Sequence, residues 1–130
     1  MDPARLKKIP VFADLSEGEL GHIAALAAEV SVPESKELVR KGDYSYDVLA
    51  IEEGTASVDR DREHIADLGP GDVFGEMGVL RREQRNATVV ATSPMRLVTL
   101  TSWDIRRLRK TAPKAVAHLR EVVAQRSDQA

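Results

Sequence analysis

The sequence predicts a mainly β fold with helices at both ends of the chain. Between about residues 29 and 101, short apolar runs alternate with turn residues, whereas apolar residues on either side recur at helical spacing. Many short strands separated by glycine turns are typical of a sandwich, a barrel or a jelly roll. We expect one domain over residues 1–130, with helical segments at 1–28 and 102–130 around a β-barrel at 29–101.

The first helix is predicted from a capping pattern. Ser16 stands at the expected N-cap and Glu19 follows three residues later, as in a capping box. The apolar residues that follow recur at helical spacing and are Leu20, Ile23, Ala24 and Ala27. A helix is therefore expected over roughly residues 16–28. Ahead of it, Ile9 to Phe12 suit an apolar turn docked on the domain, because Pro10 disfavours helix in the residue before it.

The central region contains the expected strands. Their cores are residues 30–32, 38–39, 48–51, 55–58, 64–66, 87–91 and 95–100. The charged run at 59–63 is typical of a solvated hairpin tip, and Leu68 to Asp72 form a strong turn signal. Phe74 is expected in the core.

Two further helices are predicted after the strands. Thr101 suits an N-cap, and Asp104 lies at the favourable end of the helix dipole. This helix should end near residues 111–112, and Pro113 is well placed in the first turn of the next. The second helix has an apolar stripe, which by default packs on the barrel, formed by Val116, Leu119, Val122 and Val123. Trp103 is expected to pack, and the basic residues at 106, 107, 109 and 110 to form a solvated face.

Composition excludes several kinds of protein. The formal net charge is −2, with 19 basic and 21 acidic residues, so nothing general indicates nucleic acid or an anionic membrane as a partner. The absence of cysteine excludes disulfides, thiolate metal sites and a cysteine nucleophile. The N-terminus lacks the apolar run of a signal peptide, and no stretch is apolar enough to cross a bilayer. We expect a cytoplasmic protein.

The segment after Phe74 carries the strongest functional pattern. Gly75 permits a sharp turn and close approach to a ligand, and a helical turn starting at Glu76 would offer free N–H groups to an anion. Arg85 adds a planar charge that can bind two oxygens of one phosphate. A carboxylate beside a phosphate is explained if Glu76 accepts hydrogen bonds from hydroxyl groups. A phosphorylated ribose satisfies both residues.

These residues carry a resemblance to a known family. Residues 69–78, continued by 85–89, resemble the phosphate-binding cassette of cyclic-nucleotide-binding domains. Residues 10–16 look like the entry segment of that family, and residues 41–43 and 51–56 look like its barrel turns. The resemblance implies an eight-stranded jelly-roll β-barrel with an N-terminal helix and C-terminal lid helices, the last closing over the base.

The resemblance also implies roles for individual residues. Glu76 would accept from the ribose 2′-hydroxyl, and Arg85 would pair with the exocyclic oxygens of the cyclic phosphate. The expected ligand-binding residues, some acting through backbone N–H groups, are Gly75, Glu76, Met77, Gly78, Arg85, Asn86, Ala87 and Thr88. Gln84 stands where many members have proline, and Asn86 where many have alanine, which leaves the base preference open.

The leading hypothesis is a stand-alone, non-enzymatic sensor of cyclic AMP or cyclic GMP, with no catalytic cofactor or metal. Its signal would pass through the C-terminal helices to an effector protein or across a homodimer, and no direct DNA or membrane binding is expected. One alternative is the same fold used as an interaction or dimerisation module without nucleotide binding. The other is a cupin-like barrel enzyme, although His22, His64 and His118 lack the spacing of converging ligands. A Ser-His-Asp site would lack the usual G-x-S-x-G pattern.

Overall fold

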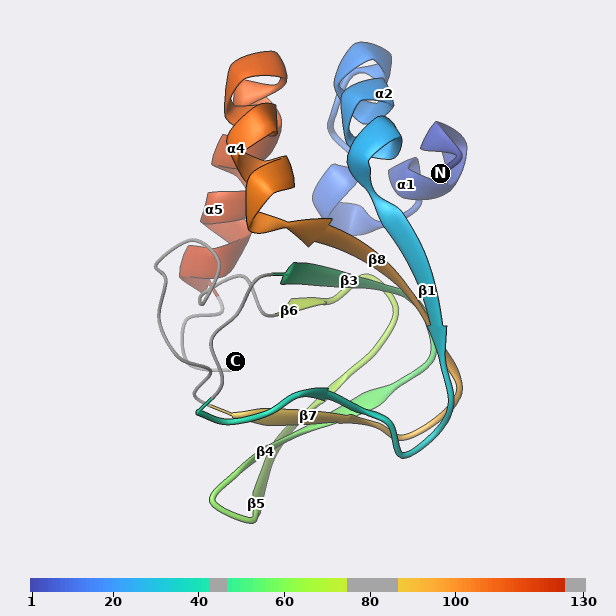
Figure 1. The fold of residues 1–130 in the computed structure, drawn as a ribbon, viewed down its shortest axis with the longest axis vertical. Helices are drawn as coiled ribbons and strands as arrows, with labels where there is room; N and C mark the ends of the chain where they lie inside the picture. Colours follow the sequence, from blue (N-terminus) through green and yellow to red (C-terminus); the bar gives the residue numbers. More distant parts are fainter. Residues whose placement is uncertain (43–46, 75–86, 126–130) are drawn as a thin grey trace.

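Two antiparallel sheets face each other, and helices cover the outer side of one of them (Figure 1). The computed structural model describes residues 1–42, 47–74 and 87–125. The helices are α1 (Pro3–Lys7), the 3-10 helix η1 (Pro10–Phe12), α2 (Glu17–Leu26), α4 (Ser102–Thr111) and α5 (Pro113–Gln125). The strands are β1 (Ala28–Val32), β2 (Glu37–Val39), β3 (Asp47–Glu53), β4 (Ala56–Arg60), β5 (Glu63–Leu68), β6 (Val73–Phe74), β7 (Thr88–Ala91) and β8 (Met95–Thr101).

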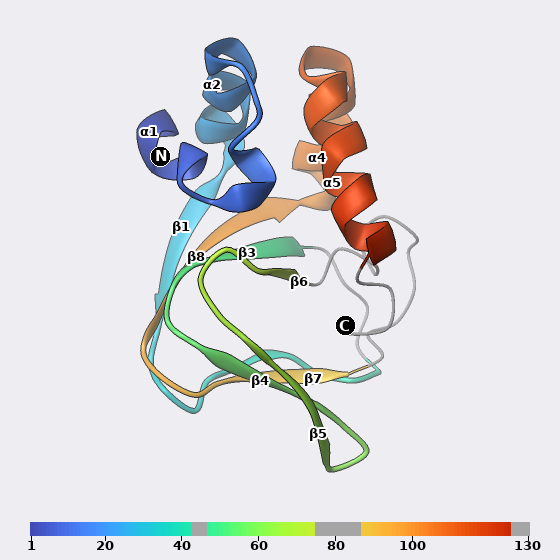
Figure 2. The same cartoon turned by 180° about the vertical axis from the view of Figure 1, so that it is seen from behind.

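The eight strands of the described residues divide equally between the sheets. One sheet has the order β1-β8-β3-β6 and the other the order β2-β7-β4-β5. Seen from behind, the labelled helices lie beyond β8 and β3, on the side away from β7 and β4 (Figure 2). The mainly β fold with helices at both ends, predicted from the sequence, is confirmed.

Residues Val48 to Ile51 of β3 are buried on both faces of the β1-β8-β3-β6 sheet, because the strand separates two hydrophobic clusters. Val48 and Ala50 of β3 pack with the helices, whereas Leu49 and Ile51 belong to the cluster between the sheets. This alternation follows from the two-residue period of a strand. It explains why β3 is one continuous apolar run in the sequence.

The predicted first helix and its cap are confirmed. The Ser16 hydroxyl accepts from the backbone N–H of Glu19 at 3.2 Å, and the Glu19 carboxylate accepts from the backbone N–H of Ser16 at 3.1 Å. The hydrogen bond from the Ser16 backbone, followed by that with its side chain, lowers the pKa of Glu19. The helix ends at Leu26, two residues before the predicted limit, because Ala27 is extended and leads into β1.

Residues ahead of this helix hold one predicted and one unpredicted element. The apolar turn at Ile9 to Phe12 is confirmed as η1, and Ile9, Val11 and Phe12 are buried. The helix α1 was not predicted. Asp2 caps it by accepting from the backbone N–H of Ala4, and Pro3 occupies its first turn.

The strands extend further than the sequence suggested. The hairpin tip predicted at 59–63 is narrower, because only Asp61 and Arg62 form the turn, both with positive φ (52° and 68°). Cross-strand pairs hold the rest of that run, including Arg60 opposite Glu63. The short strand β6 was not predicted, but the expected burial of Phe74 is confirmed.

The C-terminal helices begin where the sequence predicts. Thr101 caps α4 by accepting from Asp104, and Pro113 opens α5. Val116 and Leu119 are buried in the cluster beneath the helices. Within the described part of the chain, no helix combines the length and the apolar character needed to span a bilayer.

The prediction that Trp103 packs is wrong. Its side chain is 70% exposed. Helical spacing explains the difference, because Ile105 and Leu108 occupy the buried face of α4 and Trp103 lies on the opposite one. The predicted solvated face of basic residues on this helix is confirmed.

Candidate functional site

Most of the predicted site lies outside the described residues. That part comprises Gly75, Glu76, Met77, Gly78, Gln84, Arg85 and Asn86. Their roles remain predictions. The structure does describe the residues on either side, Phe74 and, after the gap, Ala87 and Thr88.

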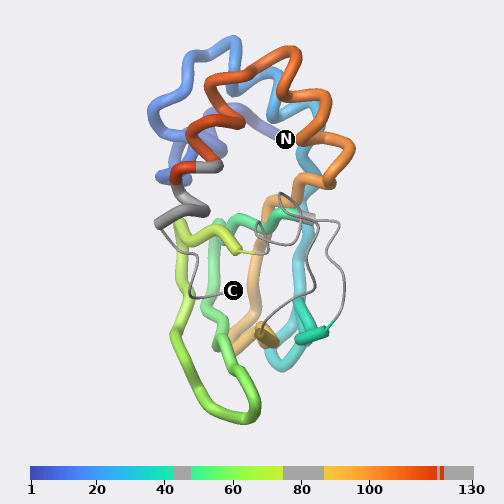
Figure 3. The backbone as a smooth tube through the Cα atoms, turned by 90° about the vertical axis from the view of Figure 1, so that its left-hand side faces the viewer, coloured from blue at the N-terminus to red at the C-terminus, as the bar shows by residue number. Residues whose placement is uncertain are grey.

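Phe74 and Ala87 anchor the two ends of this segment in the interior between the sheets. Phe74 pairs with Leu49 of β3 and is 2% exposed. Ala87 is 1% exposed and directly precedes β7 in the opposite sheet. Both belong to the same hydrophobic cluster. The described chain on either side of residues 75–86 is therefore fixed, by Phe74 in one sheet and by Ala87 next to the other (Figure 3).

The turn before β6 has a dense set of hydrogen bonds. The Asp72 carboxylate accepts from the backbone N–H of Gly69 at 2.8 Å, and the Asp72 N–H donates to the Gly69 carbonyl at 3.0 Å. The backbone of Ile51 donates to Asp72 and accepts from Gly71. Gly71 has φ +93°, and a Cβ there would meet the Pro10 ring at 3.0 Å. The turn at Gly69 to Asp72 thus fixes β6, the strand that precedes residues 75–86, and it lies against Pro10 of η1.

Thr88 is held by a contact that the sequence did not reveal. Its hydroxyl oxygen accepts from the backbone N–H of Lys41 at 3.1 Å. The Lys41 ammonium lies 2.5 Å from the Asp61 carboxylate, and its hydrogen bond lowers the pKa of that group. The chain after β2, the β4–β5 turn and the start of β7 are therefore connected at one place.

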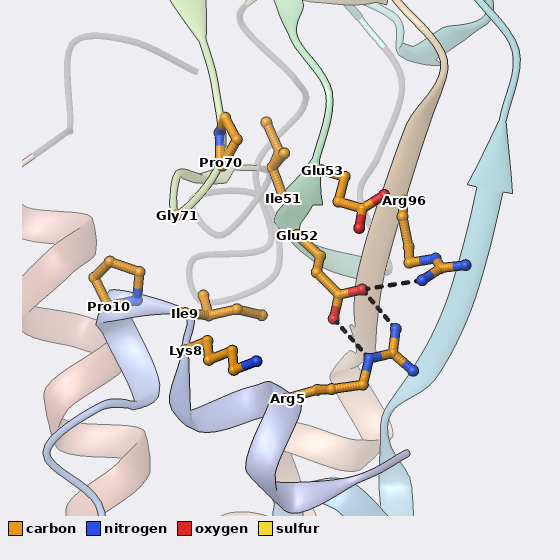
Figure 4. Close-up of a pocket in the computed structure, with 10 residues that line it drawn as sticks. All are labelled: Arg5, Lys8, Ile9, Pro10, Ile51, Glu52, Glu53, Pro70, Gly71 and Arg96. Carbon is orange, nitrogen blue, oxygen red and sulfur yellow. Dashed lines mark hydrogen bonds and ion pairs between the residues drawn. The ribbon is translucent and has the colours of Figure 1, made fainter.

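A charged pocket lies on another part of the barrel wall, between α1, η1 and the strands (Figure 4). It has a volume of about 510 Å³ and is lined by Arg5, Lys8, Ile9, Pro10, Ile51, Glu52, Glu53, Pro70, Gly71 and Arg96. Arg5 pairs with Glu52 and with Glu29, and Arg96 lies 3.7 Å from Glu52. Glu52 occupies an irregularity in the β3–β8 pairing, which no local sequence pattern indicated.

The histidines lie on separate elements: His22 on α2, His64 on β5 and His118 on α5. Among the residues that the structure describes, no three His, Cys, Asp or Glu side chains form a group suited to a metal ion.

One histidine takes part in a Ser-His-Asp cluster on the surface of the β4–β5 hairpin. His64 Nδ1 lies 2.8 Å from the Ser57 hydroxyl, and its Nε2 lies 3.3 Å from Asp67. The Ser57 hydroxyl donates to Asp59 at 3.0 Å, whereas a serine nucleophile would donate its proton to the histidine. This arrangement connects two strands and supports a structural role.

Comparison with known proteins identifies the family. Residues 29–112 match the family model described as the cyclic nucleotide-binding domain. A putative potassium channel protein of Rhodopseudomonas palustris is 30% identical over 123 residues, covering 92% of this chain and 30% of the channel. A cAMP-dependent protein kinase regulatory subunit of Yarrowia lipolytica is 32% identical over 106 residues, covering 79% of this chain and 28% of the subunit. The chain thus spans about a third or less of the length of these relatives.

Solved structures confirm the fold. The catabolite activator protein of Thermus thermophilus superposes with a TM-score of 0.82 at 26% identity, over 90% of this chain and 57% of that one. A putative cyclic nucleotide-binding protein from Geobacter metallireducens gives a TM-score of 0.83 at 22% identity, over 96% of this chain and 94% of that one. The predicted eight-stranded jelly roll with flanking helices is confirmed. With the family model matching residues 29–112, the chain belongs to the cyclic nucleotide-binding domain family.

Proposed function

We propose that this chain is a sensor domain that binds cyclic AMP through residues 75–88. The observation that carries the proposal is the position of Glu76 and Arg85 within the family match, on a segment whose two ends are buried in opposite sheets. Phe74 and Ala87 provide those ends. Glu76 and Arg85 each lie two residues from one of these buried ends in the sequence, and fixed ends reduce the conformational entropy that the segment can lose on binding.

Each proposed contact has a chemical reason. Arg85 forms a bidentate pair with the exocyclic oxygens of the cyclic phosphate, because its planar fork matches two acceptors. Glu76 accepts from the ribose 2′-hydroxyl. Gly75, Met77, Gly78 and Ala87 donate backbone N–H groups to the phosphate. Asn86 and Thr88 line the same site, and Asn86 offers both a donor and an acceptor to phosphate or purine.

The C-terminal helices are the proposed output of the sensor. Val116 and Leu119 of α5 pack in the same cluster as Val11 and Phe12 of η1, and η1 in turn touches the turn before β6 through Pro10. This chain of contacts connects β6 to α5. A nucleotide shifts the equilibrium between two arrangements of the helices only by the difference in its affinity for those arrangements. An effector protein or a second copy of the chain would receive that shift.

A thermal-shift comparison tests the proposal. Cyclic AMP at a hundred times its dissociation constant should stabilise the folded chain by about 2.7 kcal/mol. Linear 5′-AMP is the matched control, since it keeps the base and ribose but lacks the cyclic phosphate, and it should produce a much smaller shift. Cyclic GMP in a parallel arm reports the base preference. A melting temperature unchanged by either cyclic nucleotide at millimolar concentration would contradict the proposal.

A further inference from the structure

One face of α4 carries a tryptophan and a group of cations. Trp103, Arg106, Arg107 and Lys110 recur at helical spacing and are all exposed. The opposite face holds Ile105 and Leu108, which are buried. We call the exposed set Trp103, Arg106, Arg107 and Lys110 the α4 stripe. Figures 1 and 2 show α4 in the helical layer, beside α2 and α5.

The fold explains only part of this stripe. Lys110 lies in the last turn, where a cation stabilises the helix dipole. Arg106 lies mid-helix and places its guanidinium 5.1 Å from the centre of the Trp103 ring. Neither Arg106 nor Arg107 nor Lys110 forms an ion pair with another described residue. Exposed tryptophan and arginine together are typical of protein interfaces, where both residue types are enriched relative to the rest of the surface.

From these observations we infer that the α4 stripe docks an acidic segment of a protein partner. Carboxylates of the partner face Arg106, Arg107 and Lys110, and an apolar side chain lies against the Trp103 ring. Tryptophan and arginine are the residues that most often dominate binding energy at protein interfaces. Because the Arg106 guanidinium already lies over the Trp103 ring, these two side chains lose less conformational freedom when a partner binds.

Charge distribution favours a narrow acidic segment over two other occupants. In a symmetric dimer formed through α4, the stripe would face its own copy, and the cations would repel one another. A broad anionic surface such as a bilayer would also approach the rest of the domain. Because the formal net charge of the whole chain is −2, the chain as a whole does not attract such a surface. Because screening limits charge interactions to about 8 Å at physiological salt, a narrow segment responds to the stripe alone.

The single tryptophan makes the test specific, because the chain has no other one. The probe is a synthetic peptide of glutamates with leucines at helical spacing, titrated into the full chain without nucleotide, so that the result does not depend on the proposed cyclic AMP site. Tryptophan fluorescence should change to saturation, and the affinity should fall steeply with added salt. A lysine-for-glutamate version of the peptide should produce no such change.

Matched variants decide the assignment. Arg106→Gln with Arg107→Gln should weaken peptide binding by roughly tenfold, the effect of losing two surface charge pairs. Lys7→Gln with Lys8→Gln removes the same charge at the C-terminal end of α1, across the helical layer, and should leave the affinity unchanged. Equal weakening by both pairs, or no saturable change with the parent chain, would overturn the inference. Binding to phosphatidylserine vesicles without binding to the peptide would also overturn it, in favour of a membrane surface.

Discussion

Arg5 and Glu52 form a two-point ion pair that joins the first helix to the barrel. Arg5 Nε lies 3.2 Å from Glu52 Oε2, and Nη2 lies 2.5 Å from Oε1 (Figure 4). The Glu52 side chain is only 14% exposed, and Arg96 approaches it from β8. The pair also raises the pKa of Arg5, because its hydrogen bond with Glu52 favours the charged form. This contact secures α1 beside the turn that leads into β6.

Removing the charge of Glu52 should therefore loosen α1. Glu52→Gln is expected to lower the melting temperature, because Arg5 loses its bidentate carboxylate partner at a largely shielded position. Glu53→Gln is the matched control, since Glu53 is the exposed neighbour on the same strand. Thermal unfolding of both variants at low and high salt provides the measurement. Equal melting temperatures for the two variants would show that the pair contributes nothing to stability.

Gly54 should be the glycine least tolerant of substitution among those described. Its φ is +97°, and a Cβ would lie 2.5 Å from the Pro94 carbonyl oxygen and 2.8 Å from Met95 Cγ. Gly54→Ala is expected to cost about 2–5 kcal/mol of unfolding free energy, from backbone strain and overpacking together.

Gly42→Ala separates these two effects. Gly42 has a similar φ of +95°, but no atom of the described residues lies within 4 Å of the position that a Cβ would take. Only the backbone strain of about 1–2 kcal/mol should remain. Urea unfolding of the two variants measures the difference. A loss at Gly42 as large as that at Gly54 would show that the contact with the β8 strand does not matter.

Local signals in the sequence were sufficient to predict several elements. Capping residues such as Ser16 and Thr101 fix helix starts, because their side chains bond within the first turn. The strands β3 and β8 were located by residues such as Val48, Ile51 and Val98, because β-branched side chains pack well on a pleated, half-buried surface. No such signal marks α1, whose five residues are too few to show a helical period, or β6, whose two residues are defined only by pairing with β3.

The sequence predicts which residues form the candidate site, and their roles stay predictions, but it does not reveal the contacts that support the site. Glu76 and Arg85 stand out as residue types within a glycine-containing motif. The contact between Lys41 and Thr88 joins residues 47 positions apart, and so does the pair of Arg5 and Glu52. No local pattern reports such contacts, because they depend on how the sheets pack.

The ribose contact can be tested apart from the phosphate contact. Glu76→Gln should weaken binding of cyclic AMP, because an amide is a poorer acceptor for the 2′-hydroxyl than a carboxylate. The same variant should have little effect on 2′-deoxy cyclic AMP, which lacks that hydroxyl. Calorimetric titration of both nucleotides gives the four affinities of a double cycle. An equal loss with both nucleotides would remove the assignment of Glu76 to the ribose.

Calorimetric titration of the parent chain and of Arg85→Ala with cyclic AMP tests the central claim most directly. Loss of a desolvated charge pair typically costs about 2–5 kcal/mol, or roughly thirtyfold to several-thousandfold in affinity. Arg62→Ala removes the same charge at the β4–β5 turn and should leave binding unchanged. The account predicts saturable binding by the parent and a loss of that size only for Arg85→Ala, with its melting temperature preserved. Binding of equal strength by Arg85→Ala, or no binding by the folded parent, would contradict it.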